Sequence, residues 1–164
     1  MQPERTLVVV DICGKTCGLP LEDVQEIVPM ASLFRPPTIP SLLEGFLNLR
    51  GTALPVLPLG RLFGLHERPL ELHTPLVILR GAGHPIALLV DKVSRILSVT
   101  SDALLPAGED HSFNNCAEAE VVVDGRMIHL LSPERLLIEK QRRCVMEFQA
   151  MEQQRLQDLE KERA

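Results

Sequence analysis

Apolar residues occur in short runs along most of this chain, and glycine or proline interrupts one run after another. Leu7–Cys13 and Leu76–Arg80 are runs of strand length, rich in leucine, valine and isoleucine, and a glycine turn follows each. The segments after these turns, Cys17–Leu21 and Pro85–Val90, complete two predicted hairpins. Many short strands with frequent turns are typical of small barrels or a sandwich, and we predict two small β-barrels packed together.

The apolar pattern of the first half of the chain recurs in the second half. A shift of 69 positions for residues 7–28 gives the pairs Leu7 with Leu76, Gly14 with Gly83, Glu22 with Asp91, and Ile27 with Ile96. A second block matches at a shift of 74 positions, with the pairs Gly51 with Gly125, Leu57 with Leu131, and Leu62 with Leu136. The repeat predicts two related subdomains, at about 5–66 and 74–138, joined near residues 66–74.

Two further pairs of segments extend this pattern. Glu22–Val28 and Asp91–Leu97 begin with an acid and carry valine and isoleucine three residues apart, which fits either a short helical turn or a strand. Thr52–Leu57 and Arg126–Leu131 are predicted strands after glycine turns, and Asp124-Gly125 before the second is a strong hairpin signal. The 13 prolines favour edge strands and tight corners over a long flat sheet.

The C-terminal part of the chain has a different pattern. After Ser132-Pro133-Glu134, where a helix can start, no glycine or proline occurs from Ile138 to Ala164. We predict a long charged helix over residues 139–164, with a narrow apolar stripe of Ile138, Val145, Phe148, Leu156 and Leu159 beside Met151. The sequence leaves two arrangements open: the helix lies on the barrels, or it projects to meet a partner.

The composition narrows the class of protein. A chain of 164 residues has the length of one domain. Its net charge of −5 and its five phenylalanines, without tryptophan or tyrosine, argue against nucleic-acid binding, which relies on positive charge and aromatic stacking. No apolar run is long enough for direct membrane insertion, and no leader precedes the first predicted strand. The four cysteines are expected to be reduced thiols of a cytoplasmic protein, in buried or half-buried positions.

Candidate chemistry is sparse. The five histidines are scattered without the spacing of metal ligands, and Cys13 and Cys17 alone are weak evidence for a redox or zinc site. The chain contains no nucleophile elbow and no phosphate-binding glycine loop. We therefore predict that the protein is not an enzyme and that it needs neither a metal nor a cofactor. A small-molecule-binding barrel enzyme is the least favoured class.

Residues 45–65 hold the most informative motif, a charged turn Asn48-Leu49-Arg50-Gly51 between two apolar segments. One interpretation is structural: Arg50 is an exposed turn residue, Gly51 takes the positive φ, and Asn48 bonds the local backbone. The other is functional, because an arginine fixed on a tight turn beside Leu49 offers planar donors and an apolar stem to a partner. From the residues alone, both interpretations stay open.

The stretch Gly45–Leu65 resembles the signature of the CheW-like domain family, and supporting stretches are Val24–Ile27, Ala87–Val93 and Asp124–Leu137. The resemblance implies a mainly β fold of two small SH3-like five-stranded β-barrels packed together, here followed by a long C-terminal α-helix. It also implies a noncatalytic adaptor. Members of this family link the cytoplasmic hairpin tip of a chemoreceptor to the regulatory domain of a CheA-type histidine kinase, at receptor arrays on the inner face of the membrane.

The resemblance further implies where the receptor binds. The positions that it assigns to the receptor-binding surface are Arg50, Asn48, Leu49, Glu26, Val24 and Leu76. It assigns no kinase-contacting residue. Two positions depart from the family pattern, because Pro58 and Ser132 stand where the family usually has an acidic or amide residue. The helical segments that follow are therefore expected to be capped differently.

These observations lead to one expectation for the whole chain. Residues 1–138 form a CheW-like domain, and residues 139–164 form a charged C-terminal helix. The expected function is a cytoplasmic adaptor that couples methyl-accepting chemoreceptors to a CheA-type histidine kinase in chemotaxis signalling. The alternative is a scaffold of the same fold in a non-flagellar or CheA-independent pathway, which docks or self-associates through residues 139–164.

Overall fold

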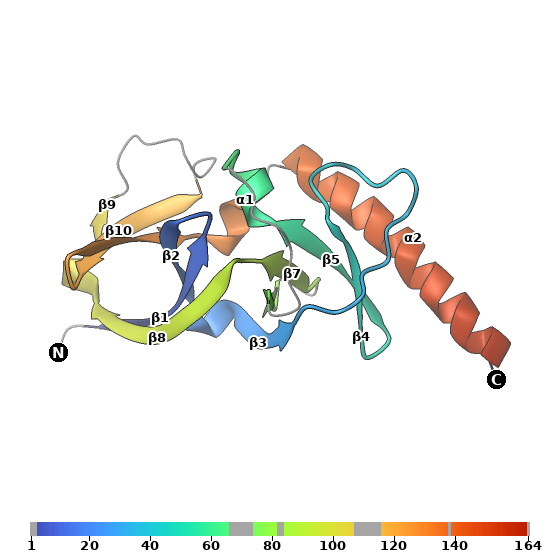
Figure 1. Cartoon of the computed structure of the whole chain (residues 1–164), viewed down its shortest axis with the longest axis horizontal. Helices are drawn as coiled ribbons and strands as arrows, with labels where there is room; N and C mark the ends of the chain where they lie inside the picture. Colours follow the sequence, from blue (N-terminus) through green and yellow to red (C-terminus); the bar gives the residue numbers. More distant parts are fainter. Residues whose placement is uncertain (1–2, 66–73, 82–83, 107–115, 138, 164) are drawn as a thin grey trace.

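The computed structural model describes residues 3–65, 74–81, 84–106, 116–137 and 139–163 of the chain (Figure 1). In that part of the chain, two β-sheets lie side by side, and a long C-terminal helix runs along one of them. The predicted fold class is thereby confirmed, because the protein is mainly β, with two packed sheets and a C-terminal α-helix.

The first sheet has six strands in the described residues, in the order β8-β1-β2-β11-β10-β9. Its strands are β1 (Glu4–Ile12), β2 (Lys15–Pro20), β8 (Lys92–Thr100), β9 (Leu105–Pro106), β10 (Ala117–Val123) and β11 (Arg126–Leu131). The second sheet has five described strands in the order β3-β6-β7-β5-β4. These are β3 (Val24–Pro29), β4 (Gly45–Leu49), β5 (Thr52–Pro58), β6 (Pro75–Leu79) and β7 (Ile86–Leu89).

The sequence repeat is visible in the order of the strands. Each strand of the second sheet has a counterpart in the first: β3 with β8, β6 with β1, β7 with β2, β5 with β11, and β4 with β10. The parallel pairing also falls at the same place in each sheet, between β2 and β11 and between β5 and β7. The expected five strands therefore describe the second sheet, whereas β9 adds a sixth strand to the first.

The two sheets exchange strands between the halves of the sequence. β3 of the first half pairs with β6, and β8 of the second half pairs with β1. The predicted joint at residues 66–73 lies outside the described residues, and each sheet contains strands from both sides of it. Both strand orders are open in the described part of the chain. The two expected barrels are thus two SH3-like sheets that do not close in the described residues; each covers a cluster of its own, and a third cluster lies between the sheets and α2.

The core consists of a cluster shared by the two sheets and a smaller cluster belonging to each sheet. In β1, Val8 and Val10 face the shared cluster, whereas Leu7 and Val9 face the cluster of the first sheet. β6 alternates in the same way between the shared cluster and the cluster of the second sheet. A strand that is buried on both faces is apolar at every position, which explains the two uninterrupted runs in the sequence.

In the part of the chain that the structure describes, three hairpins turn through two residues each, Cys13-Gly14, Arg50-Gly51 and Asp124-Gly125. Both central residues of each turn have a positive φ, between 49° and 87°. A type I′ turn requires this combination, and its twist matches that of the flanking strands. The hairpin predicted at Asp124-Gly125 is confirmed. At the Arg50 turn, the arginine as well as the glycine takes the left-handed conformation.

The two segments that the sequence left undecided are mostly strands. A short 3-10 turn, η1 (Leu21–Asp23), precedes β3, and the corresponding segment of the second half lies in β8. Two further short helical segments, α1 (Leu59–Leu62) and η3 (Pro133–Arg135), have no capping side-chain hydrogen bond at their N-termini. This finding agrees with the altered capping expected from the residues that precede them.

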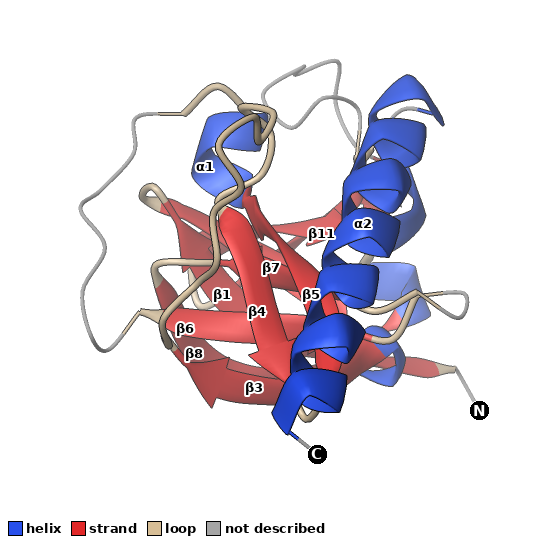
Figure 2. Ribbon diagram, turned by 90° about the vertical axis from the view of Figure 1, so that its right-hand side faces the viewer, coloured by secondary structure: helices blue, strands red, loops and turns tan. Residues whose placement is uncertain are grey.

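The C-terminal helix α2 (Glu139–Arg163) lies on the second sheet beside β5 (Figure 2). Val145 is buried in the shared cluster, and Phe148 and Leu156 pack against that cluster. The exposed members of the predicted stripe are Met151 and Leu159, and Ile138 lies outside the described residues. Of the two arrangements left open by the sequence, the structure thus has the helix lying on the sheets.

None of the four cysteines forms a disulfide bond, and two of them, Cys17 and Cys116, are buried in the shared cluster. Burial raises the pKa of the Cys116 thiol to about 12 and also raises the pKa of Cys17. Both thiols are therefore protonated at neutral pH and pack as small apolar side chains. The expectation of buried or half-buried cysteines is confirmed.

Candidate docking surface

The turn between β4 and β5 presents Arg50 to solvent on a fixed backbone. The Asn48 side-chain oxygen accepts a hydrogen bond from the Gly51 backbone N–H at 3.0 Å, which closes the turn. The Arg50 side chain is 67% exposed. The local bonds of the structural interpretation are therefore present, and the same bonds hold the guanidinium group in a position where a partner can reach it.

An ion pair connects Arg50 to the far edge of the same sheet. Arg50 Nη2 lies 2.5 Å from Glu26 Oε1 on β3. β3 and β4 are the two edge strands of the second sheet, so the sheet bends until the β4–β5 turn meets β3. The Glu26 side chain is 30% exposed and fixes the direction of the arginine. A pair of this kind at the surface adds little stability, about 0–1 kcal/mol, so its main effect is on orientation.

The other predicted receptor-binding residues are less exposed to solvent. Leu49 is half-buried and packs against the cluster of the second sheet. Val24 and Leu76 are buried, because a β-bulge between Val24 and Glu26 turns Val24 inward and Leu76 belongs to the cluster of the second sheet. The structure therefore brings Arg50, Asn48 and Glu26 together at the surface and places Val24 and Leu76 in the core.

The helix α2 supplies hydrogen bonds to the start of β5. Gln153 Nε2 donates to the Gly51 carbonyl at 2.9 Å, and its Oε1 accepts from the Ala53 N–H at 2.8 Å. Gln149 Nε2 donates to the Ala53 carbonyl at 3.1 Å. β7 pairs with β5 from Val56 onward, and no strand of the described residues pairs with these backbone groups on that side. A buried backbone group without a partner costs about 1–3 kcal/mol, which explains why two glutamines are placed there.

Sequence reasoning missed these two glutamines, although the sequence contains a signal for them. Gln149 and Gln153 are four residues apart, so they share a helix face, and that face also carries Val145 and Leu156. A polar pair inside a buried stripe requires hydrogen-bond partners in the structure that the stripe covers. The pattern indicates that partners exist, but it does not identify β5 as the element that provides them.

A second contact fixes α2 to the segment that leads into β4. The Arg155 guanidinium lies 3.6 Å from the centre of the Phe34 ring, and Arg155 Nε is 3.0 Å from Glu152 Oε2. Phe34 in turn forms an isolated bridge with Phe46 of β4. A guanidinium over an aromatic face contributes about 0.5–1 kcal/mol at a partly exposed site. The β4–β5 hairpin is thus held by α2 from two directions.

The equivalent hairpin of the first sheet carries the opposite charges. The repeat pairs four oppositely charged positions: Asp11 with Arg80, Asp23 with Lys92, Glu26 with Arg95, and Arg50 with Asp124. Arg95 Nη2 lies 3.6 Å from Asp124 Oδ2, which reproduces the contact between turn and edge strand with its polarity reversed. The repeated fold therefore presents two turns of similar backbone whose non-glycine residues, Arg50 and Asp124, carry opposite charges.

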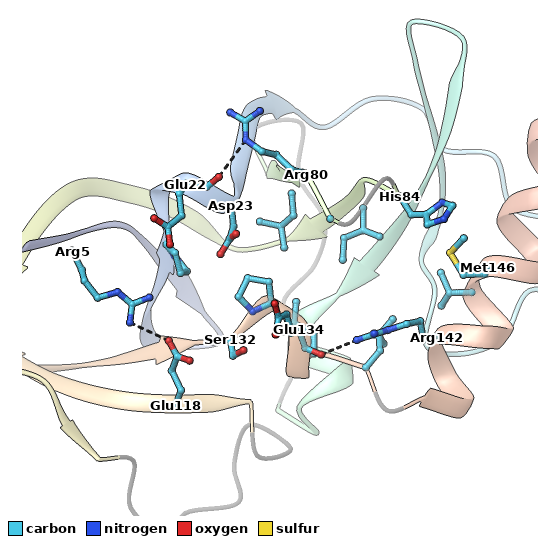
Figure 3. Close-up of a pocket in the computed structure, with 18 residues that line it drawn as sticks. Arg5, Glu22, Asp23, Arg80, His84, Glu118, Ser132, Glu134, Arg142 and Met146 are labelled. Carbon is cyan, nitrogen blue, oxygen red and sulfur yellow. Dashed lines mark hydrogen bonds and ion pairs between the residues drawn. The ribbon is translucent and has the colours of Figure 1, made fainter. Parts of the chain in front are cut away.

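A cleft of about 730 Å³ lies where the two sheets meet η3 and the start of α2 (Figure 3). Its lining mixes carboxylates with arginines, and each of these arginines is bonded to a protein oxygen. The bonds are Arg5 to the Glu118 carboxylate at 3.3 Å, Arg80 to the Glu22 carbonyl at 3.2 Å, and Arg142 to the Glu134 carbonyl at 2.7 Å. The first two contacts connect elements that are distant in the sequence, whereas Arg142 joins α2 to the neighbouring η3, and all three stabilise the walls of the cleft.

The ionised form of Asp23 is unfavourable in this cleft. Partial burial raises the pKa of Asp23, and the neighbouring carboxylates of Glu22 and Glu134 raise it further, whereas Arg5 acts in the opposite direction.

Within the described residues, no cluster of histidine, cysteine or acidic side chains has an arrangement that could hold a metal ion. We find no described helix with the length and apolar character needed to cross a membrane.

A rigid turn with an exposed arginine, on a fold of two related sheets, is a feature typical of surfaces that bind other proteins. Comparison with known proteins identifies the family. The model of the CheW-like domain family matches residues 6–141, and the chain belongs to this family. It is accordingly a CheW-type chemotaxis adaptor, and the family expected from the sequence motifs is confirmed.

The chain is similar to several chemotaxis proteins. A protein of Rhizobium etli named "Probable chemotaxis protein CheW" is 29% identical over 140 residues, which cover 84% of this chain and 90% of that protein. The chemotaxis protein CheW of Thermotoga maritima is 23% identical over 129 residues, covering 79% and 85% of the two chains. The crystal structure of the scaffolding protein TtCheW from Thermoanaerobacter tengcongensis matches with a TM-score of 0.74 and 25% identity, over 81% of this chain and 87% of that one.

Proposed function

We propose that this protein couples the cytoplasmic hairpin tip of a methyl-accepting chemoreceptor to the regulatory domain of a CheA-type histidine kinase. In this proposal, residues 1–138 form the coupling domain, and the protein works in the cytoplasm at receptor arrays. Binding both partners raises their effective concentration and lets the state of the receptor change the output of the kinase. The family membership and the names of the relatives support the chemotaxis context.

The observation that carries the receptor half of the proposal is the Arg50 turn. Its guanidinium is exposed, and its direction is fixed by the Glu26 carboxylate at 2.5 Å. A preorganised arginine loses little conformational freedom on binding and offers paired donors to carboxylates or carbonyls of a helical tip. We propose that Arg50, Asn48, Leu49 and Glu26 contact the receptor. Val24 and Leu76 support the surface from the core.

The proposal is tested by measuring the affinity of the purified full chain for two fragments from the same organism, a receptor cytoplasmic fragment and the kinase regulatory domain. We expect the wild type to bind both fragments. Arg50→Glu should lower the receptor affinity by about tenfold or more, because it removes a binding arginine and places a carboxylate next to Glu26. The kinase affinity should change by less than about twofold, because the two partners use separate faces.

Arg126→Glu is the matched control. Arg126 is an exposed arginine at the start of β11, beside the equivalent turn of the first sheet. Its reversal gives the same change in net charge and should leave the receptor affinity near that of the wild type. A wild-type protein that binds neither fragment would contradict the proposed coupling role. Equal receptor binding by the Arg50→Glu variant and the wild type would instead remove this turn from the receptor surface.

A further inference from the structure

The C-terminal helix continues well beyond the part of the chain that the family model matches. That match ends at residue 141, whereas α2 extends to Arg163. The residues of α2 that bond to β5, Gln149 and Gln153, both lie in this extension. Besides packing on the shared cluster and on Phe34, the segment therefore adds hydrogen bonds at the base of the Arg50 turn.

The bonds from α2 fix the backbone directly below the turn. Gly51 is the second central residue of the turn, and its carbonyl accepts a hydrogen bond from Gln153 at 2.9 Å. Ala53, two residues later, is bonded through both its N–H and its carbonyl. Pro55 has no N–H, so the strand presents no donor at the next position on this side. Gln149 and Gln153 thus satisfy the backbone of β5 where a neighbouring strand is lacking.

The last turns of α2 also pass close to the arginine turn. A side-chain carbon added at Gly51 would lie 3.5 Å from Glu160 Oε1, which places the helix in contact range of the turn. Arg155 stacks on Phe34, which bridges to β4, so the other strand of the hairpin is held as well. Loss of these contacts would leave the hairpin attached to the rest of the sheet mainly through the β5–β7 pairing at Val56–Pro58 and the Arg50–Glu26 pair.

We propose that the extension of α2 beyond residue 141 is a part of the receptor-docking site, in which Gln149 and Gln153 are positioning residues for Arg50. They hold the β4–β5 turn in the conformation that presents the arginine, so the receptor meets a preorganised surface. This inference rests on the proposed receptor-coupling function. Preorganisation increases affinity because a partner otherwise binds only the fraction of molecules that has the competent conformation.

The test uses the full chain with both glutamines replaced, Gln149→Leu and Gln153→Leu, which keeps the helix and its approximate side-chain volume. The receptor-fragment affinity should fall by about fivefold to tenfold, as for a turn that is competent for only a fraction of the time. The affinity for the kinase regulatory domain should stay within about twofold. Amide hydrogen exchange should become faster at Ala53, while the core strands β1 and β6 keep their protection.

Two single variants refine the test. Gln157→Leu is the matched control, because Gln157 is an exposed glutamine of the same helix, and it should bind the receptor fragment like the wild type. Gln153→Glu can still accept from the Ala53 N–H, but it cannot donate to the Gly51 carbonyl. This variant should therefore lose part of the receptor affinity that the double variant loses, because the bond from Gln149 to the Ala53 carbonyl remains.

Each alternative result overturns the inference in a recognisable way. Unchanged receptor binding by the double variant, with wild-type binding intact, would reject the positioning role alone. Equal loss of both partners together with faster exchange throughout the core would show that α2 only stabilises the fold. Tighter receptor binding would show that α2 covers the site. A wild type that fails to bind the receptor fragment would reject the proposed function itself, and this inference with it.

Discussion

The hairpins β4–β5 and β10–β11 occupy equivalent places in the two sheets and share the backbone of a type I′ turn, yet their surroundings differ. Arg50 pairs with Glu26 in the first hairpin, whereas Asp124 pairs with Arg95 in the second, with the charges reversed. Gln149 and Gln153 of α2 bond to the start of β5. As a result, Ala53 is 5% exposed, whereas Met127 at the equivalent position is 47% exposed.

Comparing the two hairpins shows which features the repeated fold requires in both sheets and which features differ between them. Turn geometry and the alternation of apolar residues are needed in both sheets, because main-chain bonds and burial determine whether the hairpin forms. Surface charge and the covering helix are not needed for the hairpin, so they can differ between the copies. Because the two ion pairs have reversed polarity, the two turns offer different charge arrangements on a similar backbone.

The largest effect on stability is expected at Ala53, which α2 covers, compared with the equivalent but exposed position Met127. Ala53→Met should lower the free energy of unfolding by about 1–3 kcal/mol, because the larger side chain must displace α2 from β5. Met127→Ala at the open position should change stability by less than about 0.5 kcal/mol. Urea denaturation of the two variants measures the difference. Similar effects at the two sites would show that α2 does not press on β5 in solution.

The two turn glycines should give nearly equal effects. Gly51 and Gly125 have φ angles of +87° and +76°, which a residue with a side chain adopts at a cost of about 1–2 kcal/mol. An added side-chain carbon meets only an ordinary contact at Gly51 and open space at Gly125. Gly51→Ala and Gly125→Ala should thus lower the melting temperature by similar amounts. A much larger loss at Gly51 would mean that the helix constrains the turn more strongly than its contacts indicate.

A smaller difference is expected between the coupling energies of the two ion pairs, Arg50 with Glu26 and Arg95 with Asp124. A double-mutant cycle on Arg50 and Glu26 should give a coupling energy of about 0.2–1 kcal/mol at low salt, because the pair is short and Glu26 is partly buried. The cycle on Arg95 and Asp124 should give a coupling energy near zero, since the atoms are 3.6 Å apart and Asp124 is 79% exposed. Raising the ionic strength should weaken the first coupling. A stronger coupling at Asp124 would reverse this ranking.

The smallest effect concerns Asp23, whose equivalent in the other half is Lys92. The folded-state pKa of Asp23 is raised above its ordinary value of 3.8, so its ionised form lowers stability at neutral pH. Asp23→Asn should therefore raise the melting temperature at neutral pH, and the gain should shrink as the pH falls through the folded-state pKa. It should vanish below 3.8, where the carboxyl group is protonated in both states. Lys92→Gln controls for removal of a charge, and a gain for Asp23→Asn that does not depend on pH would contradict the assignment.

Much of the fold could be predicted because local signals were unambiguous. The uninterrupted apolar runs predict buried strands, Asp124-Gly125 predicts a hairpin, and the absence of glycine and proline after Ile138 predicts a helix. The repeat predicts two related units but not the exchange of β3 and β8 between them. That exchange depends on long-range pairing, which periodicity within one strand does not record.

The residues assigned to the receptor-binding surface lie in two different environments, and their role in receptor binding stays a prediction. Arg50, Asn48 and Glu26 come together at the surface, whereas Val24 and Leu76 lie in the core. Burial of Val24 depends on a bulge in β3, and a change of one residue in register moves a side chain from one face of a strand to the other. No pattern in the sequence marks this bulge.

Residue type and short-range spacing are enough to establish most strands, the glycine turns at Gly14, Gly51 and Gly125, the C-terminal helix and the membership of the CheW-like domain family. They do not establish which strands pair, which side of β5 the helix covers, or that charges of opposite sign meet at equivalent turns. These features arise from contacts between residues far apart in the chain, such as Gln153 with Ala53 and Arg50 with Glu26. Their geometry is set by the packing of the whole core rather than by any local segment.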